Sequence, residues 1–309
     1  MTFLNQKKFS RFFSFCLGLL FLFSCPAIAT DWSLEDPSKG WNSRELIVRY
    51  FHNSELQTQW AWEALSRYSF KGNEHVLDYG AGDGKLSALM SFMVPKGSVW
   101  GIDISTEMMH FALKMFPSGY YKNLNFLPTS NIDLGGIPFP TKFDIVTSFC
   151  VFHLVPNPKS VLESMKLHMH PGAKLIATFP IGGNLEFFQA ASEEMAKRGW
   201  SFPSPTEGTK AMRDPNRARQ IFTDAGFSLD YFQVIDTRNS FSTKEEMIDW
   251  FEGTLSANWD IPTVGRREFF SDLADRYLVY RPQDKDNDGF VYFSLKRIDL
   301  TATPIFENR

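Results

Sequence analysis

The stretch VLDYGAGDGK, residues 76–85, decides the fold. Two apolar residues and Asp78 precede three glycines, Gly80, Gly82 and Gly84. The apolar residues predict a buried strand, and the glycines predict a tight turn from that strand into a helix. Glycine suits this turn because it accepts positive φ and lets a ligand approach the backbone without a Cβ in the way. The free N–H groups at the start of the helix favour a negatively charged or polar ligand.

A carboxylate follows the glycines at the distance that a ribose-binding site requires. Asp103 ends the next predicted strand, about 20 residues further on, where it can accept hydrogen bonds from both hydroxyls of a ribose. The alternatives for Asp103 are a helix cap and a solvated strand end. NAD and S-adenosylmethionine (SAM) both carry such a ribose. A dinucleotide-binding loop would have its third glycine at position 85, where this chain has Lys85, so the pattern favours SAM.

Short apolar runs alternate with helical patterns up to about residue 180. This alternation predicts an α/β, Rossmann-like fold, in which a parallel sheet carries helices on both faces. Beyond that point, helices lie between two further strands, and residues 199–208 read as a proline-rich surface loop. We predict one domain with a helical cap. The predicted strands are residues 75–79, 98–104, 124–128, 143–149, 174–179, 230–237 and 289–300, and the predicted helices are residues 54–68, 85–93, 107–116, 159–169, 184–200, 214–227, 243–255 and 266–278.

The N-terminus has the pattern of an export signal. Three basic residues precede the apolar stretch 12–24, and AIA at 27–29 offers a signal-peptidase site. The apolar stretch is shorter than the roughly 20 residues that span a bilayer. We predict a cleaved signal peptide at residues 1–29, which leaves the mature protein periplasmic or secreted. A lipoprotein anchored at Cys25 and an uncleaved anchor are the alternatives.

Composition limits the partners. The net charge is −3, and no run of basic residues interleaved with aromatics is present, so we expect no nucleic-acid partner. A membrane contact is expected only through the signal or a lipid anchor. After signal cleavage Cys150 is the only cysteine, so the sequence predicts no internal disulfide.

The segment DKDNDGF, residues 284–290, resembles half of an EF-hand. The twelfth position of that motif should hold a bidentate glutamate, but this chain has Leu295 there, and a strand rather than a helix follows. We therefore predict a tight turn before the last strand, with weak calcium binding as the alternative.

The D-x-G-x-G-x-G arrangement in residues 78–84 resembles motif I of the class I SAM-dependent methyltransferases. The resemblance extends through GIDIS, IPFPTKFDIVTSFCVFHLVPNP and HPGAKLIATFP. Within that family the chain is most similar to the small-molecule carboxyl methyltransferases, such as the trans-aconitate and juvenile-hormone-acid methyltransferases, through NSELQTQWA, WFEGTL and DGFVYFSLKRI. The resemblance implies a seven-stranded sheet whose last strand runs antiparallel beside strand six. It also implies that the chain is an enzyme with SAM as cofactor and a small-molecule acceptor.

The resemblance assigns cofactor-binding residues. The glycine-loop residues would face the methionine part of SAM, and the end of the second strand would hold ribose and adenine. A residue after strand three would touch the adenine, although the family often has an acidic residue there and this chain does not. The assigned residues are Asp78, Tyr79, Gly80, Gly82, Gly84, Asp103, Ile104, Ser130 or Asn131, and Phe149 near the sulfonium.

The acceptor side has three candidate residues. His153 follows strand four. We expect it to act as a catalytic general base or to donate a hydrogen bond to the substrate; the alternative is that it only caps the next loop. Gln57 matches a substrate-facing glutamine of the carboxyl methyltransferases, and Tyr50 would line the same cap. A carboxylate acceptor is already ionised at neutral pH and needs no base. The alternative functions are an exported non-catalytic SAM-binding or effector protein and an NAD-dependent oxidoreductase.

These interpretations divide the chain into four segments. The signal peptide is followed by N-terminal cap helices, a SAM-binding core, and substrate-side helices with the last two strands of the same domain. The expected boundaries are residues 1–29, 30–72, 73–180 and 181–309.

Overall fold

The computed structural model describes residues 40–129, 134, 137, 139–287 and 289–306. The chain divides between Pro37 and Ser38 into two units, and every described residue belongs to the second unit. The expected signal peptide, residues 1–29, lies outside the described residues and stays a prediction.

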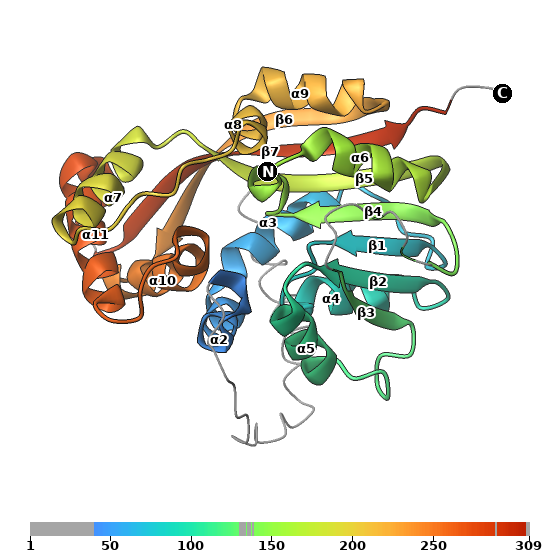
Figure 1. The fold of residues 1–309 in the computed structure, drawn as a ribbon, viewed down its shortest axis with the longest axis horizontal. Coiled ribbons are helices and arrows are strands. Elements are labelled where there is room, and N and C mark those ends of the chain that lie inside the picture. The colour runs from blue at the N-terminus through green and yellow to red at the C-terminus, as the bar shows by residue number, and fades with distance from the viewer. Residues whose placement is uncertain (1–39, 130–133, 135–136, 138, 288, 307–309) are drawn as a thin grey trace. The chain divides into compact units, whose positions relative to one another are not determined.

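A mixed sheet organises the described residues (Figure 1). Its strands are β1 (His75–Tyr79), β2 (Ser98–Asp103), β3 (Leu124–Pro128), β4 (Phe143–Phe149), β5 (Met169–Gly182), β6 (Phe227–Phe241) and β7 (Val291–Pro304). In the described part of the chain these seven strands follow the order β3-β2-β1-β4-β5-β7-β6. Strand β7 runs antiparallel to both of its neighbours, β5 and β6. The expected position of the last strand is therefore confirmed.

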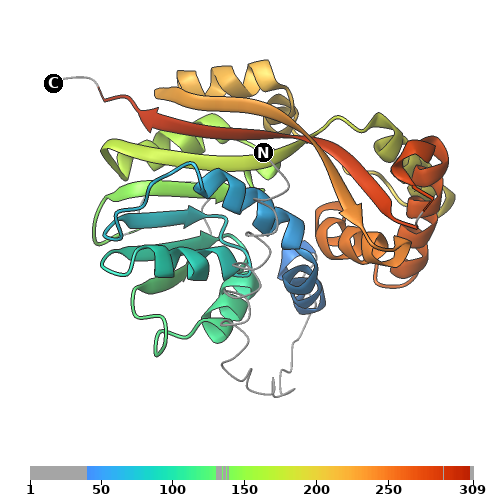
Figure 2. The same ribbon diagram turned by 180° about the vertical axis from the view of Figure 1, so that it is seen from behind.

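Helices cover both faces of this sheet. The helices are η1 (Gly40–Asn42), α2 (Arg44–Asn53), α3 (Glu55–Leu65), α4 (Lys85–Met93), α5 (Thr106–Met115), η2 (Phe152–Leu154), α6 (Pro158–Leu167), α7 (Leu185–Lys197), α8 (Glu207–Arg213), α9 (Pro215–Asp224), α10 (Lys244–Trp259), α11 (Arg266–Tyr280) and η3 (Pro282–Asp284). Helices α6 and α9 lie on one face (Figure 1), and α3 and α4 lie on the other (Figure 2). Val76 and Leu77 point to opposite faces of β1 and are both fully buried. Because helices cover both faces of the sheet, both sides of the strands are buried, which explains their runs of consecutive apolar residues.

Local side chains fix several helix starts. Asp214 precedes Pro215 at the start of α9, and its Oδ1 accepts hydrogen bonds from the backbone N–H groups of Asn216 and Arg217 at 2.8 and 3.0 Å. The hydroxyl of Thr243 accepts from the backbone N–H of Glu246 at the start of α10. These caps satisfy N–H groups that have no partner inside the helix.

Strands β6 and β7 continue beyond the rest of the sheet. The pairing of β7 with β5 ends at Gly182 and Lys296, whereas its pairing with β6 continues to Phe241 and Val291. Helices α7, α10 and α11 pack around this two-stranded extension (Figures 1 and 2). Their buried side chains form a largely aromatic cluster that includes Phe187, Trp250, Phe251, Phe269, Tyr277 and Phe293.

The elements differ from the sequence predictions in three places. Residues 44–53 form α2, although no helix was expected before residue 54. The predicted loop at residues 199–208 ends earlier, because α8 begins at Glu207 behind the capping hydroxyl of Thr206. Strands β5, β6 and β7 are longer than predicted. The added residues of β6 up to Phe241 pair with β7 in the two-stranded extension, whereas β5 ends at Gly182, before that extension.

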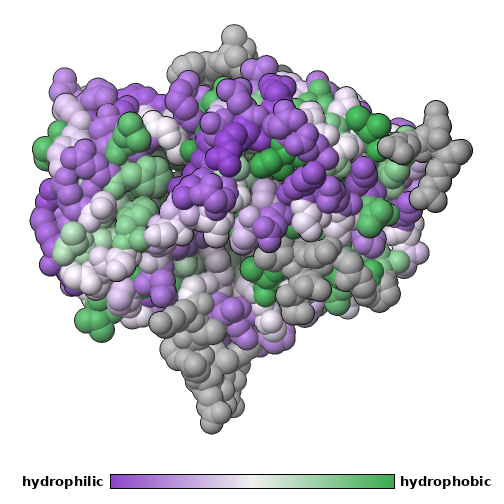
Figure 3. All heavy atoms as spheres, turned by 45° about the horizontal axis from the view of Figure 1, so that its top comes forward, coloured by the Kyte–Doolittle hydropathy of each residue, from purple (hydrophilic) through white to green (hydrophobic). Residues whose placement is uncertain are grey.

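No helix among the described residues is long and apolar enough to cross a membrane. On the face shown in Figure 3, hydrophilic and hydrophobic side chains are interspersed.

Candidate functional site

The glycine loop connects β1 to α4 with three glycines at positive φ, Gly80 at 76°, Gly82 at 55° and Gly84 at 81°. A Cβ at position 80 would lie 2.2 Å from a methyl carbon of Val151, and a Cβ at position 84 would lie 2.7 Å from Phe126. A Cβ at position 82 would meet no atom within 4 Å. Packing therefore requires two of the glycines, while the third leaves the backbone open to a ligand.

Asp103 closes the loop from the neighbouring strand. Its Oδ2 accepts a hydrogen bond from the backbone N–H of Gly82 at 3.0 Å, and its Oδ1 accepts from that of Ser105 at 2.8 Å. Burial raises the pKa of Asp103, against these hydrogen bonds, which lower it. The structure thus brings the predicted ribose carboxylate to the glycine loop. Ile104, the next predicted residue, is 59% exposed beside it.

Asp78 lies beneath the loop in a polar network of its own. Its carboxylate accepts hydrogen bonds from the hydroxyls of Ser87 at 2.5 Å and Thr147 at 2.8 Å. Burial raises the pKa of Asp78 to about 6. Asp78 also borders the cavity at the loop, whereas Tyr79 points into the core and stacks on Phe152 with ring centroids 6.5 Å apart.

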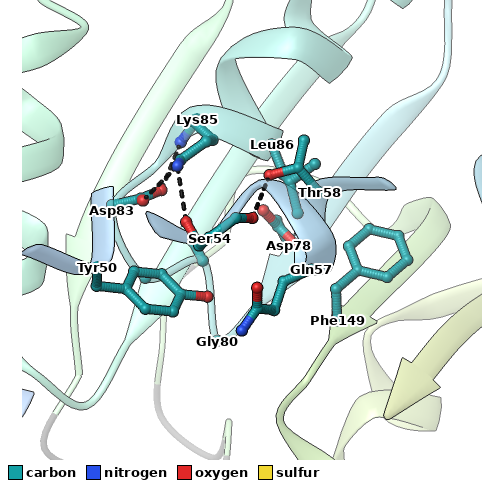
Figure 4. A pocket seen from close by; sticks show the side chains of 12 residues that line it. Tyr50, Ser54, Gln57, Thr58, Asp78, Gly80, Asp83, Lys85, Leu86 and Phe149 are labelled. Atoms are coloured by element: carbon teal, nitrogen blue, oxygen red, sulfur yellow. Dashed lines mark hydrogen bonds and ion pairs between the residues drawn. The ribbon is translucent and has the colours of Figure 1, made fainter. Parts of the chain in front are cut away.

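The junction of α2 and α3 covers the glycine loop and leaves a cavity of about 30 Å³ (Figure 4). A cavity of this size has room for one or two water molecules. The cavity is too small to hold a nucleoside. The lining residues are Tyr50, Ser54, Gln57, Thr58, Asp78, Gly80, Ala81, Gly82, Asp83, Lys85, Leu86 and Phe149.

Lys85 links the α2–α3 junction to the glycine loop. Its ammonium donates hydrogen bonds to the backbone carbonyl of Phe51 at 2.6 Å and to the hydroxyl of Ser54 at 2.7 Å. It also lies 3.2 Å from Oδ2 of Asp83 (Figure 4). In the sequence pattern Lys85 counts only against NAD binding, and its contacts with α2 and α3 depend on the fold, so the pattern could not predict them.

Two predicted acceptor residues, Tyr50 and Gln57, lie at this cavity beside Gly80 (Figure 4). The amide oxygen of Gln57 accepts a hydrogen bond from the indole N–H of Trp250 at 3.3 Å. Burial raises the pKa of Tyr50 well above its ordinary value, so this phenol stays protonated. Phe149, at the end of β4, borders the same cavity. The first cap helices and α10 therefore meet at the site.

His153 lies in η2 and is not among the residues that line the cavity. Its buried Nδ1 has no hydrogen-bond partner among the described residues. Burial and the positive charge of Arg213 lower the pKa of His153 to about 3. A base with such a pKa accepts a proton poorly at neutral pH, which favours a hydrogen-bonding role over that of a general base.

Some predicted residues stay untested, and others were missed. Ser130 and Asn131 lie outside the described residues, so the adenine contact stays a prediction. Gly84 lies in the loop but does not line the cavity. Ser54, Thr58, Asp83 and Leu86 line it without having been predicted. Of these only Asp83 has a sequence signal, because it lies within the glycine-rich stretch 76–85.

The segment from Asp284 forms the predicted turn. The buried carboxylate of Asp284 accepts hydrogen bonds from the hydroxyl of Tyr277 and from Nε of Arg281. Asp286 accepts from the backbone N–H of Phe290 and the hydroxyl of Tyr292. Over the residues that the structure describes, no group of three or more His, Cys, Asp or Glu side chains could hold a metal ion.

The sequence model of a family described as "Methyltransferase domain" matches residues 70–226. Protein 235L of Invertebrate iridescent virus 6, whose name assigns it to the methyltransferases, is 30% identical over 135 residues. That match covers 44% of this chain and 46% of the viral protein, so the chain spans about half the length of this relative.

Two further relatives carry the names of carboxyl methyltransferases. Trans-aconitate 2-methyltransferase of Mycolicibacterium gilvum (strain PYR-GCK) is 21% identical over 248 residues, which cover 78% of this chain and 91% of that protein. Juvenile hormone acid O-methyltransferase of Drosophila melanogaster is 34% identical over 102 residues, which cover 30% of this chain and 32% of that protein.

Solved structures share the fold. The YcgJ protein of Bacillus subtilis superposes with a TM-score of 0.53 at 15% identity, over 80% of this chain and 98% of that one. Phosphoethanolamine N-methyltransferase 2 of Haemonchus contortus, solved with phosphomonomethylethanolamine and S-adenosylhomocysteine, superposes with a TM-score of 0.51 at 16% identity, over 80% of this chain and 53% of that one. The predicted α/β methyltransferase-like fold is confirmed.

Proposed function

The chain belongs to the methyltransferase domain family, and from that premise we propose that it is a SAM-dependent methyltransferase acting on a small molecule. The leading acceptor is a carboxylate oxygen, in line with the two carboxyl methyltransferases among its relatives. SAM would supply a methyl group on a cationic sulfur, so the electrophile would arrive already activated. The protein's task is then to align a nucleophile and to exclude water.

The observation that carries this proposal is the pairing of Gly82 with Asp103. The backbone N–H of Gly82 donates to the Asp103 carboxylate at 3.0 Å, and the space over Gly82 is open for more than 4 Å. A ribose needs a carboxylate acceptor of this kind beside an uncrowded backbone. The glycine loop and Asp103 would hold the nucleoside, and Asp78 would support the loop from below.

The residues opposite the loop would position the acceptor. Tyr50 and Gln57 offer a phenol and an amide at the cavity, and both side chains are held by packing or a hydrogen bond. Phe149 and the α2–α3 junction would keep water from the reacting atoms. A carboxylate nucleophile carries its charge at neutral pH, so no side chain has to remove a proton.

Calorimetric titration of SAM into the full-length protein and into its Asp103→Ala variant tests the cofactor. We expect the variant to lose about tenfold to hundredfold in SAM affinity, because it loses hydrogen bonds to a charged group. Asp224→Ala, at an exposed position on α9, is the matched control and should bind normally. Tighter binding of NADH than of SAM would instead support an oxidoreductase.

The acceptor needs a separate assay. Formation of S-adenosylhomocysteine with a panel of small carboxylic acids would support the carboxylate. SAM binding with no methylation of any acid or extract would favour the alternative, a non-catalytic SAM-binding or effector protein.

We also propose that the protein is exported after cleavage near Ala29, with a lipid anchor at Cys25 as the alternative. The support is the N-terminal sequence pattern alone. N-terminal sequencing of the mature protein from fractionated cells would test this, and an intact Met1 in the cytosolic fraction would contradict it.

A further inference from the structure

Arg213 ends α8 with a guanidinium that has no hydrogen bond or ion pair among the described residues. The guanidinium lies over the ring of Phe188, whose centroid is 5.9 Å away. The side chain is half-buried, and burial lowers the pKa of Arg213 with no anion to compensate. The end of a seven-residue helix favours a cation through its dipole, but that attraction leaves the five N–H donors unbonded.

His153 is a second polar group without a partner in the same place. Helix α8 packs against η2, which carries His153. The buried Nδ1 has no hydrogen-bond partner within the described residues, and the ring is neutral at physiological pH. Buried polar groups without partners are rare in folded proteins. Nδ1 of His153 is such a group, and the half-buried guanidinium of Arg213 is an unbonded cation beside it. Together they indicate a site that a ligand completes.

This pair lies at the edge of the sheet where the candidate site is. β4 ends at Phe149, which borders the cavity, and Cys150 then turns the chain with a φ of 57°. The next residue, Val151, packs on the Cβ position of Gly80. His153 therefore follows two residues after the contact with the glycine loop.

The neighbouring strand brings Arg213 to the same edge. β5 ends at Gly182, whose Cβ position lies 3.3 Å from Phe188, the ring that Arg213 contacts. β1, β4 and β5 are adjacent and parallel. Their carboxyl ends meet at one edge, where ligands of open α/β sheets bind.

We propose that Arg213, assisted by His153, binds a carboxylate of the methyl acceptor that is not the group being methylated, so that the acceptor is a dicarboxylic acid. This inference rests on the proposed function. A guanidinium that grips a carboxylate in bidentate fashion occupies the oxygen lone pairs that an in-line nucleophile needs. One cation with a planar fork and one neutral imidazole suit a carboxylate better than a doubly charged phosphate.

The test measures acid binding rather than turnover. Linear dicarboxylates from glutarate to suberate, and the monocarboxylates of equal carbon number, are titrated into the full-length protein with and without S-adenosylhomocysteine. We expect at least one dicarboxylate to bind tenfold or more tightly than its monocarboxylate. Arg213→Met should abolish this preference, and Arg213→Lys should restore part of it, since the charge returns without the fork.

Arg217→Met is the matched control, because Arg217 is exposed on α9 and loses the same charge. It should keep the preference, and all variants should melt cooperatively near the wild-type temperature. A preference unchanged by Arg213→Met, or the lack of any preference in the folded wild-type protein, would overturn the inference. A folded protein that binds neither SAM nor S-adenosylhomocysteine would defeat the proposed function, and the titrations without cofactor would still decide the role of Arg213.

Discussion

The glycine-loop end of the site and the η2–α8 end hold their polar groups in opposite ways. At the loop, Asp78, Asp103 and Lys85 are each bonded to other parts of the protein. At the other end, Nδ1 of His153 and the guanidinium of Arg213 have no such partner among the described residues. The named groups at the first end already have partners within the protein, whereas the two groups at the second end are available to a ligand. The difference separates residues whose geometry the fold fixes in advance from residues whose hydrogen bonds depend on the molecule that binds.

The largest change in stability is expected from adding a Cβ atom in the glycine loop. Gly80→Ala would put a Cβ 2.2 Å from Val151 at a φ of 76°. We expect a loss of about 2–5 kcal/mol in the free energy of unfolding, from overpacking and left-handed strain together. In Gly82→Ala the new Cβ has no close neighbour, so only the left-handed backbone strain remains. We expect this variant to lose about 1–2 kcal/mol in the free energy of unfolding. Urea denaturation measures both, and equal losses would contradict the packing that we describe.

The next largest effect is the pH dependence of stability that the buried carboxylate of Asp78 causes. Its pKa rises from 3.8 to about 6 in the folded protein. The folded state then holds a proton that the unfolded state has released, so this group's contribution to stability falls between about pH 4 and pH 6. The fall amounts to about 3 kcal/mol. Asp78→Asn removes this dependence.

The measurement is the free energy of unfolding of both proteins from pH 4 to pH 7. The stability of the variant relative to wild type should rise by that amount across the range. A flat difference would mean that the pKa of Asp78 is close to its ordinary value in the folded protein.

Lys85→Met should weaken the attachment of the α2–α3 junction to the glycine loop. The variant loses two hydrogen bonds, to Phe51 and Ser54, and the contact with Asp83. We expect a loss of about 1–3 kcal/mol in stability and faster amide exchange in residues 50–58. Lys159→Met, at an exposed position on α6, is the control. Unchanged exchange in the Lys85 variant would show that packing alone holds the α2–α3 junction.

The smallest effect is expected at His153. Its pKa of about 3 predicts that the ring stays neutral, with constant NMR shifts, between pH 5 and pH 8. The spectrum of a 13C-histidine-labelled sample, assigned by comparison with His153→Gln, would show this. A midpoint within that range would reveal an anion beside the ring and remove the contrast between the two ends.

Local sequence was sufficient to predict the glycine loop, the carboxylate of Asp103 beside it and most of the sheet. The predicted bounds of β1, β3 and β4 match the structure, because these strands are short apolar runs between clear turn signals. The glycine loop and Asp103 were found because the turn needs glycine and because the strand ends in a carboxylate. Both signals lie within one strand–helix–strand stretch, about 20 residues apart.

The features that the sequence did not predict depend on tertiary contacts. Helix α2 has only Leu46 and Ile47 fully buried, so its apolar pattern is too sparse to predict. Helix α8 is short and rests on the loop after η2, where Gly208 packs against the carbonyl of Pro156. The approach of Arg213 to His153 joins segments about 60 residues apart, and no local pattern encodes it. The end of β6 near Phe241 lies in the two-stranded extension around which α7, α10 and α11 pack.

The strand order has a consequence for the order of folding during synthesis. β7 follows β6 in the chain but lies between β6 and β5. A ribosome that has released β6 has still not made the strand that joins it to the sheet. Until β7 emerges, β5 has an open edge and the ribbon under the aromatic cluster cannot form. Nascent chains that stop before Val291 should therefore expose a strand edge that other chains can pair with.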